Sequence, residues 1–144
     1  MSRKVKTALC LLLSLLLLLP LNVIASAATT SESQVQPRWS YTDATYAGLS
    51  IAPDGKSISI ADAEGYQNIT TKIHIKMTLQ KYTVLWWSKV ETWEATFNTY
   101  YAAMNEITYV NSGTYRVKAE FTVYSGSNSE EITMFSQENK FTKS

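Results

Sequence analysis

The chain has 144 residues, 13 of them basic and 12 acidic, and a formal net charge of +1. This near balance, without a basic patch, gives no electrostatic footprint for nucleic acid and excludes it as an expected partner. A single cysteine excludes a disulfide framework within the chain. The fold must therefore be held together by its hydrophobic core.

The first residues have the order of a secretory signal peptide. Three cationic side chains within the first six residues precede an apolar tract at 8–19, which Pro20 ends. A stretch of small residues follows and provides an A-x-A cleavage site, with cleavage expected after Ala27 and, as a second choice, after Ala28. As a helix the tract spans roughly 18 Å, short of a hydrocarbon core of about 30 Å, which disfavours an uncleaved anchor. We predict a signal peptide at 1–27 and a secreted, extracellular protein.

Cleavage after Ala27 changes the composition of the protein. It removes 27 of the 144 residues, three of the cations, none of the acids and the only cysteine, leaving 117 residues with a net charge of −2. Residues 28–37 are small and polar and predict a flexible tail. Residues 38–144 are long enough for one core and predict a single domain. No membrane association is expected once the signal peptide is gone.

Turn residues and alternating hydrophobicity predict strands throughout this domain. Pro53-Asp54-Gly55-Lys56 has the composition of a tight turn and predicts a hairpin. Two segments alternate with period two, so each has one apolar face. These faces comprise Ile69, Thr71, Ile73, Ile75, Met77 and Leu79 in one segment, and Tyr115, Val117, Ala119, Phe121 and Val123 in the other. The predicted strands are about 43–51, 56–62, 69–80, 84–95, 99–109, 114–124 and 130–140.

The segment between residues 84 and 104 fits two structures. Six apolar residues at spacings of three and four form an amphipathic helical stripe: Trp86, Val90, Trp93, Phe97, Tyr100 and Met104. The abundance of Trp, Thr, Tyr and Val instead favours strands. We expect two strands that meet near Phe97-Asn98. An α+β fold with a helix at about 85–104 is the alternative.

Seven short antiparallel strands predict an all-β fold, a single immunoglobulin/fibronectin-III-like β-sandwich. A local pattern supports this fold class: Tyr115 follows the Asn111-Ser112-Gly113 turn and precedes Val117 by two residues. In such sandwiches a tyrosine at this place bonds back to the backbone, and the residue two positions on is buried between the sheets. The spacing therefore predicts a tyrosine corner at Tyr115.

Several short motifs, in this order and spacing, resemble a family of short secreted proteins of Gram-positive bacteria (Firmicutes) that carry a domain of unknown function. The motifs are Arg38-Trp39-Ser40-Tyr41, Ala47-Gly48-Leu49-Ser50-Ile51, Leu79-Gln80-Lys81-Tyr82, Val90-x-x-Trp93, Gly113-Thr114-Tyr115-Arg116-Val117-Lys118 and Thr122-Val123-Tyr124-Ser125-Gly126. The resemblance implies an extracellular β domain. It implies no activity.

Residues able to carry catalysis are sparse. The single histidine, His74, alternates with Lys72 and Lys76 on the polar face of a predicted strand, where solvent exposure accounts for it. Asp62 and Glu64 offer oxygen ligands of the type that Ca²⁺ takes, but acids beside a glycine are also ordinary turn residues. The sequence predicts no catalytic, cofactor or metal site. We do not expect an enzyme, and a small hydrolase is the least favoured class.

The aromatic content is the one functional hint, with four Trp and nine Tyr. Trp86 and Trp87 are adjacent, as are Tyr100 and Tyr101, so on a strand one ring of each pair faces outward. Such rings stack on sugars or anchor protein partners, although they also fill cores. We expect a secreted, non-enzymatic module that binds a glycan, cell-wall or protein partner. The alternative is a structural or matrix protein that self-associates through sheet edges. The sequence fixes neither ligand nor oligomeric state.

Overall fold

The computed structural model describes residues 39–143. The predicted signal peptide at 1–27, with its cleavage after Ala27, and the predicted tail at 28–37 lie outside these residues. Contacts group Pro37–Ser144 into one compact unit.

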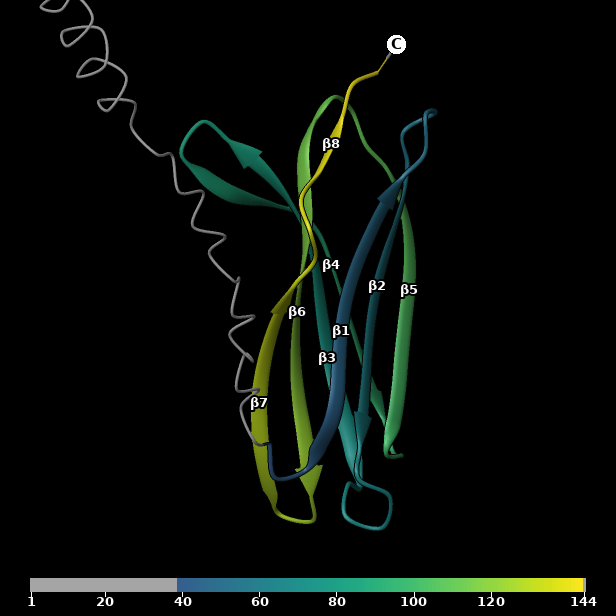
Figure 1. The fold of residues 1–144 in the computed structure, drawn as a ribbon, viewed down its shortest axis with the longest axis vertical. Coiled ribbons are helices and arrows are strands. Elements are labelled where there is room, and N and C mark those ends of the chain that lie inside the picture. The colour runs from purple at the N-terminus through teal and green to yellow at the C-terminus, as the bar shows by residue number, and fades with distance from the viewer. Residues whose placement is uncertain (1–38, 144) are drawn as a thin grey trace, which may run out of the picture. The chain divides into compact units, whose positions relative to one another are not determined.

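The described residues form an all-β fold of eight strands in two antiparallel sheets (Figure 1). One sheet has the order β1-β2-β5, with β1 at Thr42–Ile51, β2 at Lys56–Gly65 and β5 at Tyr101–Tyr109. The other has the order β4-β3-β6-β7, with β3 at Lys72–Thr83, β4 at Trp86–Phe97, β6 at Gly113–Ser125 and β7 at Asn128–Phe135. The short strand β8 (Asn139–Phe141) also pairs with β6. This arrangement confirms the predicted all-β antiparallel sandwich.

The two alternating segments build most of the core. The predicted inward residues of β6 are all buried, as are Ile73, Ile75, Met77 and Leu79 of β3. Ile69 is an exception, because β3 begins only at Lys72 and the preceding residues form a turn. Asn68 adopts a positive φ of 66° in this turn, and Ile69 is exposed. Thr71 also precedes β3 and is exposed, so the prediction that Ile69 and Thr71 belong to the buried face is wrong.

Residues 84–104 contain no helix. They form the turn at residues 84–85, all of β4, a turn at residues 98–100 and the start of β5. Along β4, Trp93, Ala95 and Phe97 pack against the core at every second position. This period-two packing selects the strand prediction, and the helix alternative at 85–104 is wrong.

The Pro53-Asp54-Gly55 turn joins β1 to β2 as predicted. Gly55 has a φ of 86°, which a side chain would strain, and its amide donates to the Ala52 carbonyl at 2.9 Å. The Asp54 carboxylate accepts a hydrogen bond from the Lys56 amide at 3.0 Å. The turn therefore fixes the register of the β1–β2 hairpin.

The tyrosine corner is present. The Tyr115 hydroxyl donates to the Asn111 carbonyl at 2.7 Å, and Tyr115 and Val117 are both buried. This hydrogen bond ties the loop before β6 to the strand.

The last predicted strand, 130–140, is divided into β7 and β8. At the division the Ser136 hydroxyl accepts a hydrogen bond from the Val117 amide at 2.8 Å, while the Ser136 amide donates to the Val117 carbonyl at 2.9 Å. A side chain thus replaces one backbone partner of β6 and interrupts the ladder.

Glu130 on β7 forms hydrogen bonds to the start of β1 in the other sheet. Its carboxylate accepts hydrogen bonds from the Ser40 and Tyr41 amides, both at 2.8 Å, and from the Thr42 hydroxyl at 2.7 Å. These three bonds hold the entry to β1 against the other sheet.

The inner faces of the two sheets contribute unequally to the core. Those of β3 and β6 carry large side chains, whereas β2 turns only Ser57, Ser59, Ala61 and Ala63 inward. The opposite face of β2 carries Ile58, Ile60, Asp62 and Glu64, none of them fully buried. The isoleucines of β2 therefore point away from the core, which leaves the outer face of its sheet unusually apolar.

Candidate functional site

The outer face of β1-β2-β5 gathers tyrosine and isoleucine side chains. Strand register places Ile58 opposite Ile107, while Tyr109 lies opposite Lys56 at the same end of the sheet. Toward the other end, Tyr46 lies opposite Asp62 and Tyr101 opposite Glu64. The three tyrosines and Ile107 are all exposed. Water-facing apolar groups on neighbouring strands of this kind are typical of a contact surface.

A cleft of about 140 Å³ lies at the acidic end of this face. Tyr46 and Tyr101 line it from the two outer strands, and Asp62 and Glu64 line it from the central strand β2. Ala44 lies opposite Glu64, and its small side chain leaves the space open. The cleft therefore combines two aromatic rings with two carboxylates.

The position of the Tyr46 ring depends on Gly48, two residues later in β1. A Cβ atom at Gly48 would lie 2.7 Å from both the Cε1 and the hydroxyl oxygen of Tyr46, so this ring lies over Gly48 on the outer face of β1. Any side chain at position 48 would displace the ring. Gly48 therefore positions Tyr46 as one side of the cleft.

Partial burial between the outer strands raises the pKa of the Asp62 carboxyl above its ordinary value, because removal from water disfavours the charged form. No ion pair with Asp62 or Glu64 is formed within residues 39–143. A cationic or hydroxyl group of a ligand can therefore donate to either carboxylate.

The four aromatic residues singled out in the sequence lie at two separate places. Trp86 and Trp87 are at the turn between β3 and β4, where Trp86 is exposed and Trp87 half-buried. Tyr100 and Tyr101 are at the opposite end of β4, both exposed, and only Tyr101 lines the cleft. The structure thus separates the two pairs.

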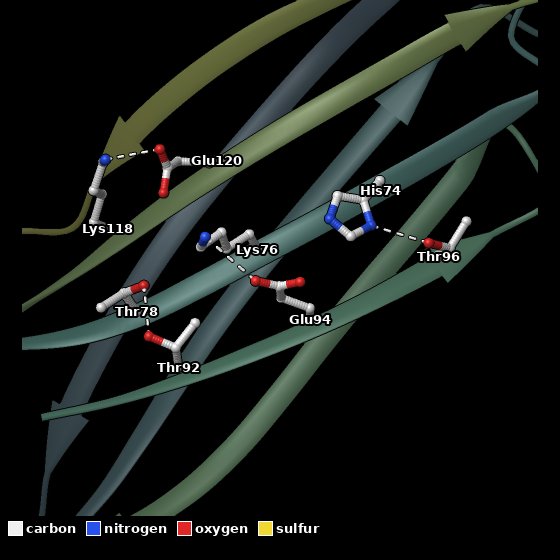
Figure 2. A network of polar contacts seen from close by, with 8 residues as sticks. All are labelled: His74, Lys76, Thr78, Thr92, Glu94, Thr96, Lys118 and Glu120. Carbon is white, nitrogen blue, oxygen red and sulfur yellow. Dashed lines mark hydrogen bonds and ion pairs between the residues drawn. The ribbon is translucent and has the colours of Figure 1, made fainter. Parts of the chain in front are cut away.

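The outer face of the second sheet is polar. Figure 2 shows cross-strand pairs between β3 and β4: Lys76 Nζ lies 3.4 Å from Glu94 Oε1, and the Thr78 and Thr92 hydroxyls are 3.1 Å apart. His74 Nδ1 is hydrogen-bonded to the Thr96 hydroxyl at 2.9 Å. These groups pair with one another across β3 and β4.

Toward the β3–β4 turn this face ends in a stack of rings around Arg116. The Arg116 guanidinium carbon lies 4.2 Å from the centre of the Trp87 ring and 4.3 Å from that of Phe135. Tyr82 continues the stack, with its ring centre 5.3 Å from that of Trp87. The Arg116 Nε donates to the Gln80 side chain at 2.9 Å. Trp87 is therefore engaged within the protein.

The comparisons with known proteins add no relative. No family model matches the chain, and neither a curated protein nor a solved structure matches it. In residues 39–143 no three metal-ligating side chains gather at one place, so Asp62 and Glu64 have no third ligand beside them there. Among the same residues no helix is long and apolar enough to cross a membrane.

Sequence reasoning missed Tyr46 and the pairing of Asp62 with it. A signal is present in β2, where Ser and Ala alternate with Ile, Asp and Glu. Small residues at every second position allow the sheets to approach closely and turn the larger side chains outward. That pattern predicts which side chains of β2 face outward. It does not predict the cleft, because the cleft residues come together only through the register of β1 and β5 against β2.

Proposed function

We propose that the protein is a secreted, non-enzymatic binding module that recognises a saccharide outside the cell. The observation that supports this most is the cleft on the β1-β2-β5 face, where Tyr46 and Tyr101 flank Asp62 and Glu64. Aromatic rings stack on the apolar faces of sugar rings, and carboxylates accept hydrogen bonds from hydroxyl groups. The predicted signal peptide, the resemblance to secreted Gram-positive proteins and the aromatic surplus agree with this role.

The two carboxylates sharpen the expected ligand chemistry. A hydroxyl donor satisfies an acceptor without balancing its charge, whereas an ammonium group does both. The cleft should therefore prefer sugars that carry a free amino group over neutral sugars of the same size. Amino sugars are cell-wall and matrix components, which fits an extracellular role.

Self-association through sheet edges is less well supported. The exposed edge strand β4 carries an irregularity beside Leu79 and Gln80 of its neighbour β3. The same strand carries the charged residues Lys89, Glu91 and Glu94. Bulges and charges on an edge strand oppose pairing with another chain.

The test measures binding of residues 28–144 to oligomers of glucosamine, of N-acetylglucosamine and of glucose by isothermal titration calorimetry. This segment is suitable because Pro37–Ser144 contains every described strand and the core. We expect the glucosamine oligomer to bind most tightly. Tyr46→Ala and Tyr101→Ala should each weaken binding about tenfold, the equivalent of about 1.4 kcal/mol.

The matched control is Tyr109→Ala, which removes an even more exposed tyrosine at the far end of the same face and should leave binding unchanged. Absence of binding to all three oligomers would overturn the proposal. Equal losses in Tyr46→Ala and Tyr109→Ala would place the ligand elsewhere.

A further inference from the structure

The turn between β3 and β4 contains residues that are unfavourable for its backbone geometry. It is a two-residue loop, Val84-Leu85, closed by the pairing of Thr83 with Trp86. Such loops ordinarily contain glycine, asparagine or aspartate, because they require positive φ. Here the β-branched Val84 adopts a φ of 24°. Asn-Gly would form this turn with less strain.

Core packing does not explain these residues either. Val84 is 90 % exposed, Leu85 75 % and Trp86 64 %. The pairing of β3 with β6 ends at Lys81, so beyond it the hairpin strands pair only with each other. Figure 1 shows this end of the hairpin bending away from the other strands. We call residues 82–87 the hairpin tip.

The hairpin tip exposes an aromatic ring on each of its faces, Tyr82 on one and Trp86 on the other. Tyr82 and Trp87 lie opposite each other on one face, Trp86 lies at the neighbouring position facing the other way, and Val84 and Leu85 form the end. A lipid interface surrounds an inserted projection on both sides and would cover both rings.

The residues around the hairpin tip are positively charged, which favours an anionic partner. Lys81 and Lys89 stand just behind it on the two strands, and no acidic residue occurs between them. Arg116 lies over the Trp87 ring, and none of these three cations pairs with a carboxylate within residues 39–143. Over the same residues, acidic side chains outnumber basic ones by two. The tip is thus a locally cationic end of an anionic domain.

We propose that the hairpin tip inserts into the interface of an anionic lipid membrane, independently of the saccharide site. Val84, Leu85 and Trp86 enter the headgroup and upper acyl region, where tryptophan and tyrosine are favoured. Lys81 and Lys89 remain at the level of the lipid phosphates. The sequence predicted no membrane association after signal cleavage, because composition does not reveal that these side chains share one projecting turn.

The test uses residues 28–144, which lack the apolar tract of the predicted signal peptide, and vesicles of phosphatidylglycerol and phosphatidylcholine in a ratio of 3 to 7. We expect sedimentation with these vesicles, much weaker sedimentation with pure phosphatidylcholine, and weakening as salt rises. The double variant Leu85→Ser/Trp86→Ser should bind at least tenfold more weakly. Brominated lipids should quench tryptophan emission of the unaltered protein, which needs no variant.

The matched control is Ile107→Ser/Tyr109→Ser, which removes two exposed apolar side chains, 53 % and 70 % exposed, from the β1-β2-β5 face. It should bind vesicles like the unaltered protein. Absence of binding to both vesicle types, or equal losses in the two double variants, would overturn the proposal. So would a molar mass that rises with concentration and falls in the tip variant, because the tip would then contact a second copy.

Discussion

The two outer faces of the sandwich differ although both belong to antiparallel sheets over the same core. The β4-β3-β6 face is a ladder of mutually paired polar groups, such as Lys76 with Glu94 and His74 with Thr96. The β1-β2-β5 face carries isoleucines and tyrosines, with two carboxylates at one end. One face is satisfied by its own residues and the other is not. The difference supports the proposal that the β1-β2-β5 face binds a partner.

The difference arises inside the core. Large side chains of β3 and β6 fill the space between the sheets, so β2 contributes only serine and alanine there. The bulk of β2 then lies outward, as Ile58 and Ile60. Substitutions in the core and on the outer face of β1-β2-β5 should therefore differ in their effect on stability.

The largest expected effect is the difference in stability loss between a core substitution and an outer-face substitution. Phe121→Ala removes a fully buried ring from β6 and should lower the free energy of unfolding by about 3–5 kcal/mol. Ile107→Ser removes an exposed side chain and should change it by only about 0.5 kcal/mol. Urea unfolding followed by circular dichroism measures both. A loss of several kcal/mol in Ile107→Ser would show that the outer isoleucines are structural.

A smaller effect, of opposite sign, is expected on the inner face of β2. The Ser59 hydroxyl is buried and has no hydrogen-bond partner within residues 39–143, unlike that of Ser57, which donates to the Thr108 carbonyl at 2.6 Å. Ser59→Ala removes an unsatisfied polar group and should raise the free energy of unfolding by about 1 kcal/mol. Ser57→Ala is the matched control and should lower it. Loss of stability in both variants would mean that Ser59 has a partner.

The faces of β3 and β6 could be predicted because apolar residues alternate there over four and five positions. The tyrosine corner could be predicted because its spacing is local, from Asn111 to Tyr115. The inward face of β2 could not be predicted, because serine and alanine give no hydrophobic signal for burial. Ile69 was misplaced because the turn at Asn68 ends the alternation before β3 begins.

The candidate site could be predicted only in part. Tyr101 was identified from the outward orientation of one ring in each adjacent aromatic pair. Tyr46, Asp62 and Glu64 join it only through the register of three strands, which no local pattern encodes. The exposure of the hairpin tip likewise depends on where β6 stops pairing with β3.

The smallest expected effect concerns Asp62. It tests whether the charge of this carboxylate lowers the free energy of unfolding. Burial raises the pKa of this carboxyl in the folded protein, so the folded state holds its proton more tightly than the unfolded state. The stability from this group is therefore present at low pH and is lost as pH rises through the raised pKa. Asp62→Asn cannot ionise and avoids that loss.

Asp62→Asn should therefore be slightly more stable than the unaltered protein at pH 7, with the difference shrinking as pH falls toward the ordinary aspartate pKa of about 3.9. Paired urea unfolding curves from pH 3.5 to 7 measure it, and Asp43→Asn, an exposed neighbouring aspartate on β1, is the control. A destabilised Asp62→Asn at pH 7 would mean that the carboxylate has a stabilising partner. Higher stability together with weaker saccharide binding would identify Asp62 as a residue whose charge serves the ligand rather than the fold.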